Sequence, residues 1–146
     1  MNRDAIVRDW LGEIFTAYPG GTARFLERER DPFRNPVGRM YREGLPVLVD
    51  VALGSLDPAP ARAALDDLMR LRAVQIIDRA EAVGFLPGLK AVVRRHRATA
   101  SGDAIEAGRL AAIDRRIDAL TALAAEIDER CRAQIAEMRS RGLEAS

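Results

Sequence analysis

The C-terminal part of the sequence constrains the fold most strongly. From Asp103, a predicted N-cap, to about Arg141, apolar residues recur in alternating steps of three and four. This spacing predicts one long helix with a heptad-like seam, in which Gln134 is the one polar break. The seam positions are Leu110, Ile113, Ile117, Leu120, Ala124, Ile127, Cys131, Gln134 and Met138.

This long helix has two possible uses. It can pack entirely inside one chain, or part of it can fill the core while the excess length pairs with a second copy across a two-fold axis. We expect the second arrangement, a homodimer in which Gln134 fixes the register. The predicted dimer contact comprises Ile117, Leu120, Ile127, Gln134 and Met138.

Helical periodicity also runs through the N-terminal part. Apolar residues on one face predict a helix over about 6–18, and Pro19-Gly20-Gly21 ends it. A short turn of helix over 22–29 is expected to carry Phe25 and Leu26 inward.

A second helix start is clear at Asn35-Pro36, with Asn as N-cap and Pro at the first helical position. This helix is expected to end at Gly54-Ser55. Pro46 lies inside it, removes one backbone donor and therefore predicts a bend.

The next two helices are expected from about Pro60 to Ile77 and from Asp78 onward. Asp78 is followed by Glu81 in the spacing of a capping box. No strand signal appears. The sequence therefore predicts an all-α fold: a single domain over residues 1–146, built as a bundle of about five to six helices.

Composition excludes several classes of partner. The chain has 23 Lys and Arg against 22 Asp and Glu, so its net charge of +1 gives no reason to expect nucleic acid. No uninterrupted apolar stretch approaches the roughly 18 residues of a membrane span, so we expect no membrane insertion. The single cysteine allows no internal disulfide and fits a cytoplasmic protein.

Few residues can carry chemistry, so we expect neither an enzyme nor a cofactor. His96, the sole histidine, is flanked by arginines and is expected to face solvent. Cys131 lies on the apolar seam and is expected to be a small buried hydrophobe. A redox-sensing thiol at Cys131 or a haem ligand at His96 is the alternative to each of these readings.

Two polar groups are candidates for binding another protein. Asp66 and Asp67 lie about one turn before Arg70 and Arg72, a spacing that forms salt bridges on a solvated helix face or a polar docking edge. We keep all four as candidate partner-binding residues.

The segment from Asp31 to Gly38 is the second candidate. Its Asp-Pro and Asn-Pro turns surround Phe33, which is expected to anchor the loop in the core. The alternative is that the loop presents Arg34 and Arg39 to a partner.

Several stretches in this order resemble one known family. They are the Trp10 helix ending in Tyr18-Pro19, then DPFRNPVG at 31–38, REGL at 42–45, LDDLMRLRAVQ at 65–75, Phe85 with Leu89-Lys90, and Arg130-Cys131-Arg132. Together they resemble the N-terminal domain of RsbT co-antagonist proteins of the RsbRD type. The match spans nearly the whole chain.

The resemblance implies a non-haem, globin-like sensory domain of the stressosome that is dimeric, non-enzymatic and passes an input to a protein partner. The sequence contains no STAS domain, so scaffolding and phosphorylation by the kinase RsbT are not carried over. We expect a stand-alone chain rather than a fragment. Pro46 is a second departure, inside a helix expected to be uninterrupted.

A small-ligand or haem-binding sensor is the alternative function. A globin-like shell can enclose an apolar pocket. The side chains that can line such a pocket are Trp10, Phe15, Phe25, Met40, Tyr41 and Phe85. Packing in an ordinary core is the simpler expectation for all six.

Overall fold

The computed structural model describes residues 1–75, 77–97 and 104–145, and these contain six α-helices and no strand. The helices are α1 (Arg3–Thr16), α2 (Gly20–Arg28), α3 (Pro36–Ala52), α4 (Ala59–Val74), α5 (Arg79–Arg95) and α6 (Ala104–Ala145). The all-α prediction with a long C-terminal helix is confirmed. The globin-like arrangement that the resemblance implied stays a prediction.

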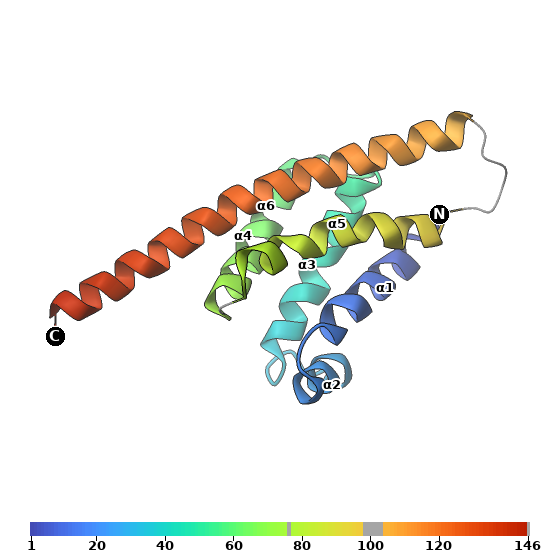
Figure 1. Cartoon of the computed structure of the whole chain (residues 1–146). Helices are drawn as coiled ribbons and strands as arrows, with labels where there is room; N and C mark the ends of the chain where they lie inside the picture. The colour runs from blue at the N-terminus through green and yellow to red at the C-terminus, as the bar shows by residue number, and fades with distance from the viewer. Residues whose placement is uncertain (76, 98–103, 146) are drawn as a thin grey trace.

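Helix α6 organises the molecule. It is 42 residues long and packs along both α4 and α5, and α5 runs beside it in the opposite direction (Figure 1). On the other side, α3 packs against α4 and α1, and the short α2 closes the end of α1. The C-terminal end of α6 extends beyond the other helices (Figure 1).

One hydrophobic core takes side chains from all six helices. Its largest fully buried members are Trp10, Tyr41, Phe15, Ile6, Leu45, Leu48, Leu65, Leu68, Met69, Leu86, Leu89 and Ile113. Each such side chain contributes about 1.5–3 kcal/mol of burial free energy, so the helices are held mainly by this shared core rather than by helix propensity.

The predicted helix starts are partly confirmed. Asn35 is the N-cap of α3, and its Oδ1 accepts from the Gly38 N–H at 2.8 Å, with Pro36 next to it. Asp78 is the N-cap residue of α5, but its side chain accepts no cap hydrogen bond, so the predicted capping box is wrong. The Asp103 cap lies outside the described residues.

Several boundaries differ from the prediction. Helix α4 ends at Val74 rather than Ile77, and Gly20 and Gly21 begin α2 rather than only ending α1. Helix α3 continues through Pro46 to Ala52, and the bend at Pro46 stays a prediction.

The short α2 does not bury both of its large apolar side chains. Leu26 is buried as predicted, whereas Phe25 is 47% exposed, which corrects the expectation that it points inward. A helix of 9 residues has one buried face, and adjacent positions 25 and 26 differ by about 100° around the axis.

Candidate functional site

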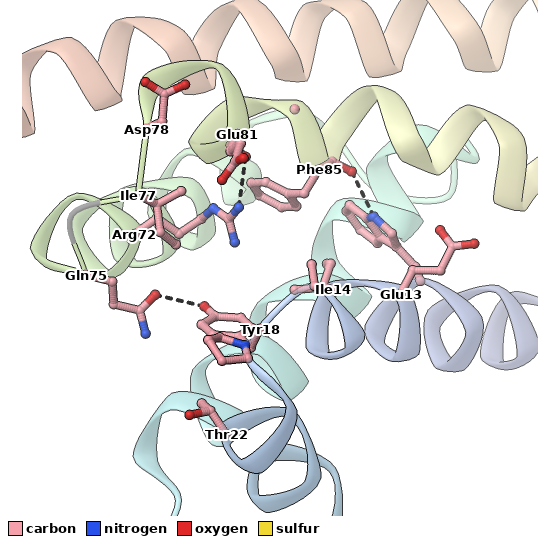
Figure 2. A pocket seen from close by; sticks show the side chains of 14 residues that line it. Glu13, Ile14, Tyr18, Thr22, Arg72, Gln75, Ile77, Asp78, Glu81 and Phe85 are labelled. Atoms are coloured by element: carbon pink, nitrogen blue, oxygen red, sulfur yellow. Dashed lines mark hydrogen bonds between the residues drawn. The ribbon is translucent and has the colours of Figure 1, made fainter.

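A cleft of about 960 Å³ opens where five segments meet: the end of α1, the Tyr18-Pro19 turn, the start of α2, the end of α4 and the start of α5. Figure 2 shows its lining side chains, with Arg72 and Gln75 from the α4 side, Glu81 and Phe85 from α5, and Tyr18 below them. Its volume falls in the range typical of small-molecule sites.

One wall of the cleft is aromatic. The rings of Trp10 and Phe85 stack with their centroids 5.8 Å apart and their planes at 19°. The Trp10 indole Nε1 also donates to the Phe85 carbonyl at 2.9 Å, so the polar edge of the indole is satisfied within the protein (Figure 2). This wall joins α1 to α5.

A chain of hydrogen bonds forms the polar end of the cleft. Tyr18 donates to Gln75 Oε1 at 2.8 Å, and the Tyr18 and Tyr41 hydroxyls are 2.8 Å apart. Because the one Tyr18 proton is used on Gln75, Tyr41 donates to Tyr18. Arg72 Nη1 donates to the Tyr41 hydroxyl at 2.7 Å. Each hydrogen bond in this series is therefore donated in the same direction, from Arg72 through Tyr41 and Tyr18 to Gln75.

The protonation of Tyr41 supports this direction. Burial raises the pKa of the Tyr41 hydroxyl well above its ordinary value, against the opposing attraction of Arg72. Tyr41 therefore keeps its proton at neutral pH, and can both accept from Arg72 and donate to Tyr18.

Arg72 is the least expected member of this site. It is only 7% exposed, and its guanidinium donates to the Glu81 and Ala82 carbonyls at 2.8 and 2.9 Å. Its guanidinium carbon lies 4.7 Å from the centroid of the Phe85 ring. Arg72 thus joins the end of α4 to the start of α5, and its predicted place on an exposed docking edge is wrong.

The other three members of that predicted edge remain at the surface. Asp67 and Arg70 are exposed and Asp66 is half-buried. Within the described residues these three form no ion pair with one another or with Arg72, whose side chain turns inward to two backbone carbonyls and the Tyr41 hydroxyl. The structure therefore separates Arg72 from Asp66, Asp67 and Arg70.

A second candidate surface is the turn between α2 and α3. Phe33 is 91% exposed, so it does not anchor the loop in the core as expected. The anchor is Asn35, which is 1% exposed and whose Nδ2 donates to the Leu26 and Glu29 carbonyls, both at 3.0 Å. The Phe33 N–H donates to the Asp31 carboxylate at 2.9 Å, which fixes the turn that holds the exposed ring.

Two arginines close to Phe33 in the sequence are also at the surface. Arg34 and Arg39 are both exposed, as the alternative interpretation of this segment required. Arg34 makes only a long ion pair, 3.9 Å, with Asp31. We call Phe33, Arg34 and Arg39 the Phe33 surface.

Comparison with known families accounts for almost the entire chain. Residues 4–143 match the family described as the RsbT co-antagonist protein rsbRD N-terminal domain. The chain belongs to this family. No curated protein and no solved structure matches it. The predicted resemblance is confirmed, and the family is one of signalling domains rather than a known family of enzymes.

The stretches that suggested the RsbRD N-terminal domain contribute to both candidate sites. Tyr18-Pro19 and the segment 71–75 supply the polar end of the cleft, and 31–38 forms the Phe33 turn. The REGL stretch also supports the turn, because Arg42 Nη2 donates to the Leu26 carbonyl at 3.0 Å. The resemblance is therefore confirmed, whereas the buried place expected for Phe33 and the exposed place expected for Arg72 are wrong.

His96 does not face open solvent in this RsbRD N-terminal domain, contrary to expectation. Its side chain is 23% exposed, and its Nε2 pairs with the Asp9 carboxylate of α1. This contact holds the pKa of Asp9 below its ordinary value. His96 does not line the cleft, so the geometry does not favour the haem alternative.

Of the six side chains predicted to line an apolar pocket, only two line the cleft. Trp10 and Phe85 line the cleft, whereas Phe15 and Tyr41 are buried in the core, Met40 is half-buried and Phe25 is exposed. Cys131 is 6% exposed on α6, so the prediction of a buried thiol is confirmed.

Three of the five residues of the predicted dimer contact are buried in the core of a single chain, and the other two are exposed. Ile117, Leu120 and Ile127 are at most 4% exposed inside a single chain, so they cannot meet a second copy without opening the domain. Beyond Cys131, Gln134 is exposed and Met138 is 69% exposed. Only these two predicted positions are free to contact a second copy.

Two further findings concern the described part of the chain. It contains no group of three His, Cys, Asp or Glu side chains placed to hold a metal ion. It also contains no helix that is both long enough and apolar enough to cross a membrane.

Proposed function

We propose that this RsbRD N-terminal domain is a non-enzymatic signalling module that acts by binding another protein through the Phe33 surface. The observation that carries the proposal is the exposure of Phe33, 91%, on a turn held by buried Asn35. A large exposed aromatic ring on a fixed backbone is the kind of residue that dominates protein interfaces, because it buries apolar area at little cost in ordering.

The charges around the ring indicate what the partner offers. Arg34 follows Phe33 in the turn and Arg39 lies in the first turn of α3, both are exposed, and the ion pair of Arg34 with Asp31 is long, 3.9 Å. A complementary surface has an apolar hollow for the ring, surrounded by Asp or Glu side chains. Such charge pairs at a rim set the association rate and the choice of partner more than the affinity.

Affinity capture with surface variants tests the proposal. The tagged wild-type domain, Phe33→Ala and the double variant Arg34→Glu/Arg39→Glu are used as bait in extracts of the source cells, and bound proteins are quantified by mass spectrometry. Ile105→Ala is the matched control, because Ile105 is also exposed, 83%, but lies at the start of α6. Circular dichroism confirms that each variant is folded.

The expected result is a protein whose recovery falls at least about tenfold with both Phe33-surface variants and is unchanged with the control. Equal recovery of every captured protein by the wild-type domain and the folded double variant would contradict the proposal.

A homodimer remains part of the proposed function, through a smaller contact than the sequence suggested. The exposed part of α6 beyond Cys131 presents Met138 and Gln134, with half-buried Ile135 beside them. Paired helices give a signalling domain a way to pass an input on, because a shift in their packing moves both copies.

A further inference from the structure

We propose that the cleft between α1, α4 and α5 binds a small zwitterion of the α-amino-acid class with an apolar side chain. This inference does not rest on the Phe33 surface, which lies on a different part of the chain, on the turn between α2 and α3. Three features of the cleft support it: a buried cation, unpaired carboxylates and an apolar lining.

The first argument is the buried cation. Arg72 is 93% buried, yet it forms no ion pair with any carboxylate of the described residues. Buried charges in proteins are normally neutralised, because removing an ion from water costs several kcal/mol. Two carbonyls and one hydroxyl use three of its five N–H groups, and one N–H on each terminal nitrogen remains. A ligand carboxylate supplies the missing charge and matches this fork.

The second argument is the charge of the neighbouring side chains. Glu81 and Asp78, both exposed, line the same cleft and form no ion pair with a described residue. Glu81 lies next to Arg72, since its own carbonyl accepts from Arg72 Nη2 (Figure 2). A third lining carboxylate, Glu13, is already paired with Arg95 at 2.5 Å. A simple anion would be repelled here, whereas a ligand with an ammonium group beside its carboxylate meets both charges.

The third argument is the apolar remainder of the cleft. Phe85 and Ile77, both half-buried, form the apolar lining that a ligand can reach, and the Phe85 ring is held in place by stacking on Trp10, which is 1% exposed. Burying a hydrocarbon side chain here contributes about 25 cal/mol for each Å² removed from water. The cleft therefore favours amino acids such as leucine or phenylalanine over glycine or aspartate.

The chain provides its own reporter for the test. Trp10 is the sole tryptophan, and it lines the cleft. The 146-residue protein is titrated with L-leucine and with L-phenylalanine, and binding is followed by Trp10 fluorescence and by isothermal titration calorimetry. We expect a saturable change with a Kd below about 1 mM. Two analogues of leucine, 4-methylpentanoate without the amino group and 3-methylbutylamine without the carboxylate, are expected to bind at least about tenfold more weakly.

A variant pair tests the ammonium partner without disturbing the fold. Glu81→Gln keeps the backbone carbonyl that holds Arg72 and removes only the charge, and is expected to weaken leucine binding by at least about tenfold. Glu129→Gln, an exposed carboxylate on α6, is the matched control and is expected to leave binding unchanged.

Three results would overturn the proposal. The first is no fluorescence change and no heat with either amino acid up to about 10 mM. The second is binding of 4-methylpentanoate as tight as that of leucine, which would indicate a plain anion site. The third is unchanged leucine affinity in folded Glu81→Gln.

Discussion

At position 35, one asparagine side chain connects three stretches of backbone. Its Oδ1 caps α3 at the Gly38 N–H, and its Nδ2 donates to the carbonyls of Leu26 and Glu29 at the end of α2. Because Asn35 is 1% exposed, water cannot replace these bonds when the side chain is removed. The geometry of the Phe33 surface depends on this one residue.

The first prediction compares two asparagine caps. Asn35→Ala is expected to lower the free energy of unfolding by about 2–3 kcal/mol, because it removes a cap and takes a donor from the Glu29 carbonyl, whereas the Leu26 carbonyl keeps its bond from Arg42. Asn2→Ala, at the exposed cap of α1, is expected to cost about 1 kcal/mol. Urea unfolding measures both, and equal losses in the two variants would contradict the role given to Asn35.

The second prediction concerns acid stability. The His96 ring holds the pKa of Asp9 below its ordinary value of 3.8 in the folded state. Ionised Asp9 therefore stabilises the folded state above pH 3.8, and this contribution is lost as the pH falls through the lower folded pKa. We expect the stability difference between the wild-type protein and Asp9→Asn to be present near neutral pH and to shrink below pH 3.8.

His96→Ala is the control for this effect, because it removes the cause while leaving Asp9 in place. In urea unfolding, the free energy of unfolding of His96→Ala should depend on pH in the acid range as weakly as that of Asp9→Asn. A difference between Asp9→Asn and the wild-type protein that stays constant from neutral pH to strongly acidic pH would rule out the proposed linkage.

Single residues are also where sequence reasoning was weakest. Phe33 was placed in the core and His96 in solvent, because large apolar side chains are usually buried and arginine-flanked histidines are usually exposed. The places of both residues depend on tertiary contacts. The buried side chain at the turn is Asn35 instead of Phe33, and α1 brings the Asp9 carboxylate to His96. The spacing of residues along one helix does not predict such contacts with other elements.

At the scale of elements, the Arg72–Tyr41–Tyr18–Gln75 chain ties together α4, α3 and the end of α1. The helices themselves were predictable, because the period of apolar residues and the capping residues are local signals. These signals located every helix to within a few residues at its ends. The chain was not predictable, since its bonds join residues as far apart as 57 positions.

The third prediction tests the centre of this chain. Tyr41→Phe removes the hydroxyl that accepts from Arg72 and donates to Tyr18, and is expected to lower the free energy of unfolding by about 2 kcal/mol. Tyr18→Phe, at the half-buried end, is expected to cost about 1 kcal/mol. Thermal and urea unfolding measure the order of the two, and a larger loss for Tyr18→Phe would contradict the central place of the buried Tyr41 hydroxyl in these hydrogen bonds.

At the scale of the whole molecule, one part of the α6 seam packs in the core and another part is exposed. The sequence pattern did not show where the first part ends. The seam positions up to Cys131 fill the core, and only the extension beyond it is left for another molecule. The period of the seam is continuous, so it cannot show where the neighbouring helices end (Figure 1). That boundary depends on how far α4 and α5 reach along α6.

The fourth prediction is a dimer through this extension. Light scattering at tens of micromolar is expected to give twice the mass of one chain, and Met138→Glu is expected to give the single-chain mass by placing like charges across the two-fold axis. Ile105→Glu, at the other end of α6, is the control and should remain dimeric. A wild-type monomer under these conditions would remove the dimer from the account.

The proposed contact between the Phe33 surface and a protein partner can be tested in the source cells by photo-crosslinking. A photoreactive phenylalanine analogue placed at position 33 is compared with the same analogue at position 105, which is similarly exposed. We expect a discrete crosslinked partner from position 33, absent from position 105 and lost when Arg34 and Arg39 are changed to Glu. No crosslinked protein from position 33, or the same set of proteins from both positions, would contradict it.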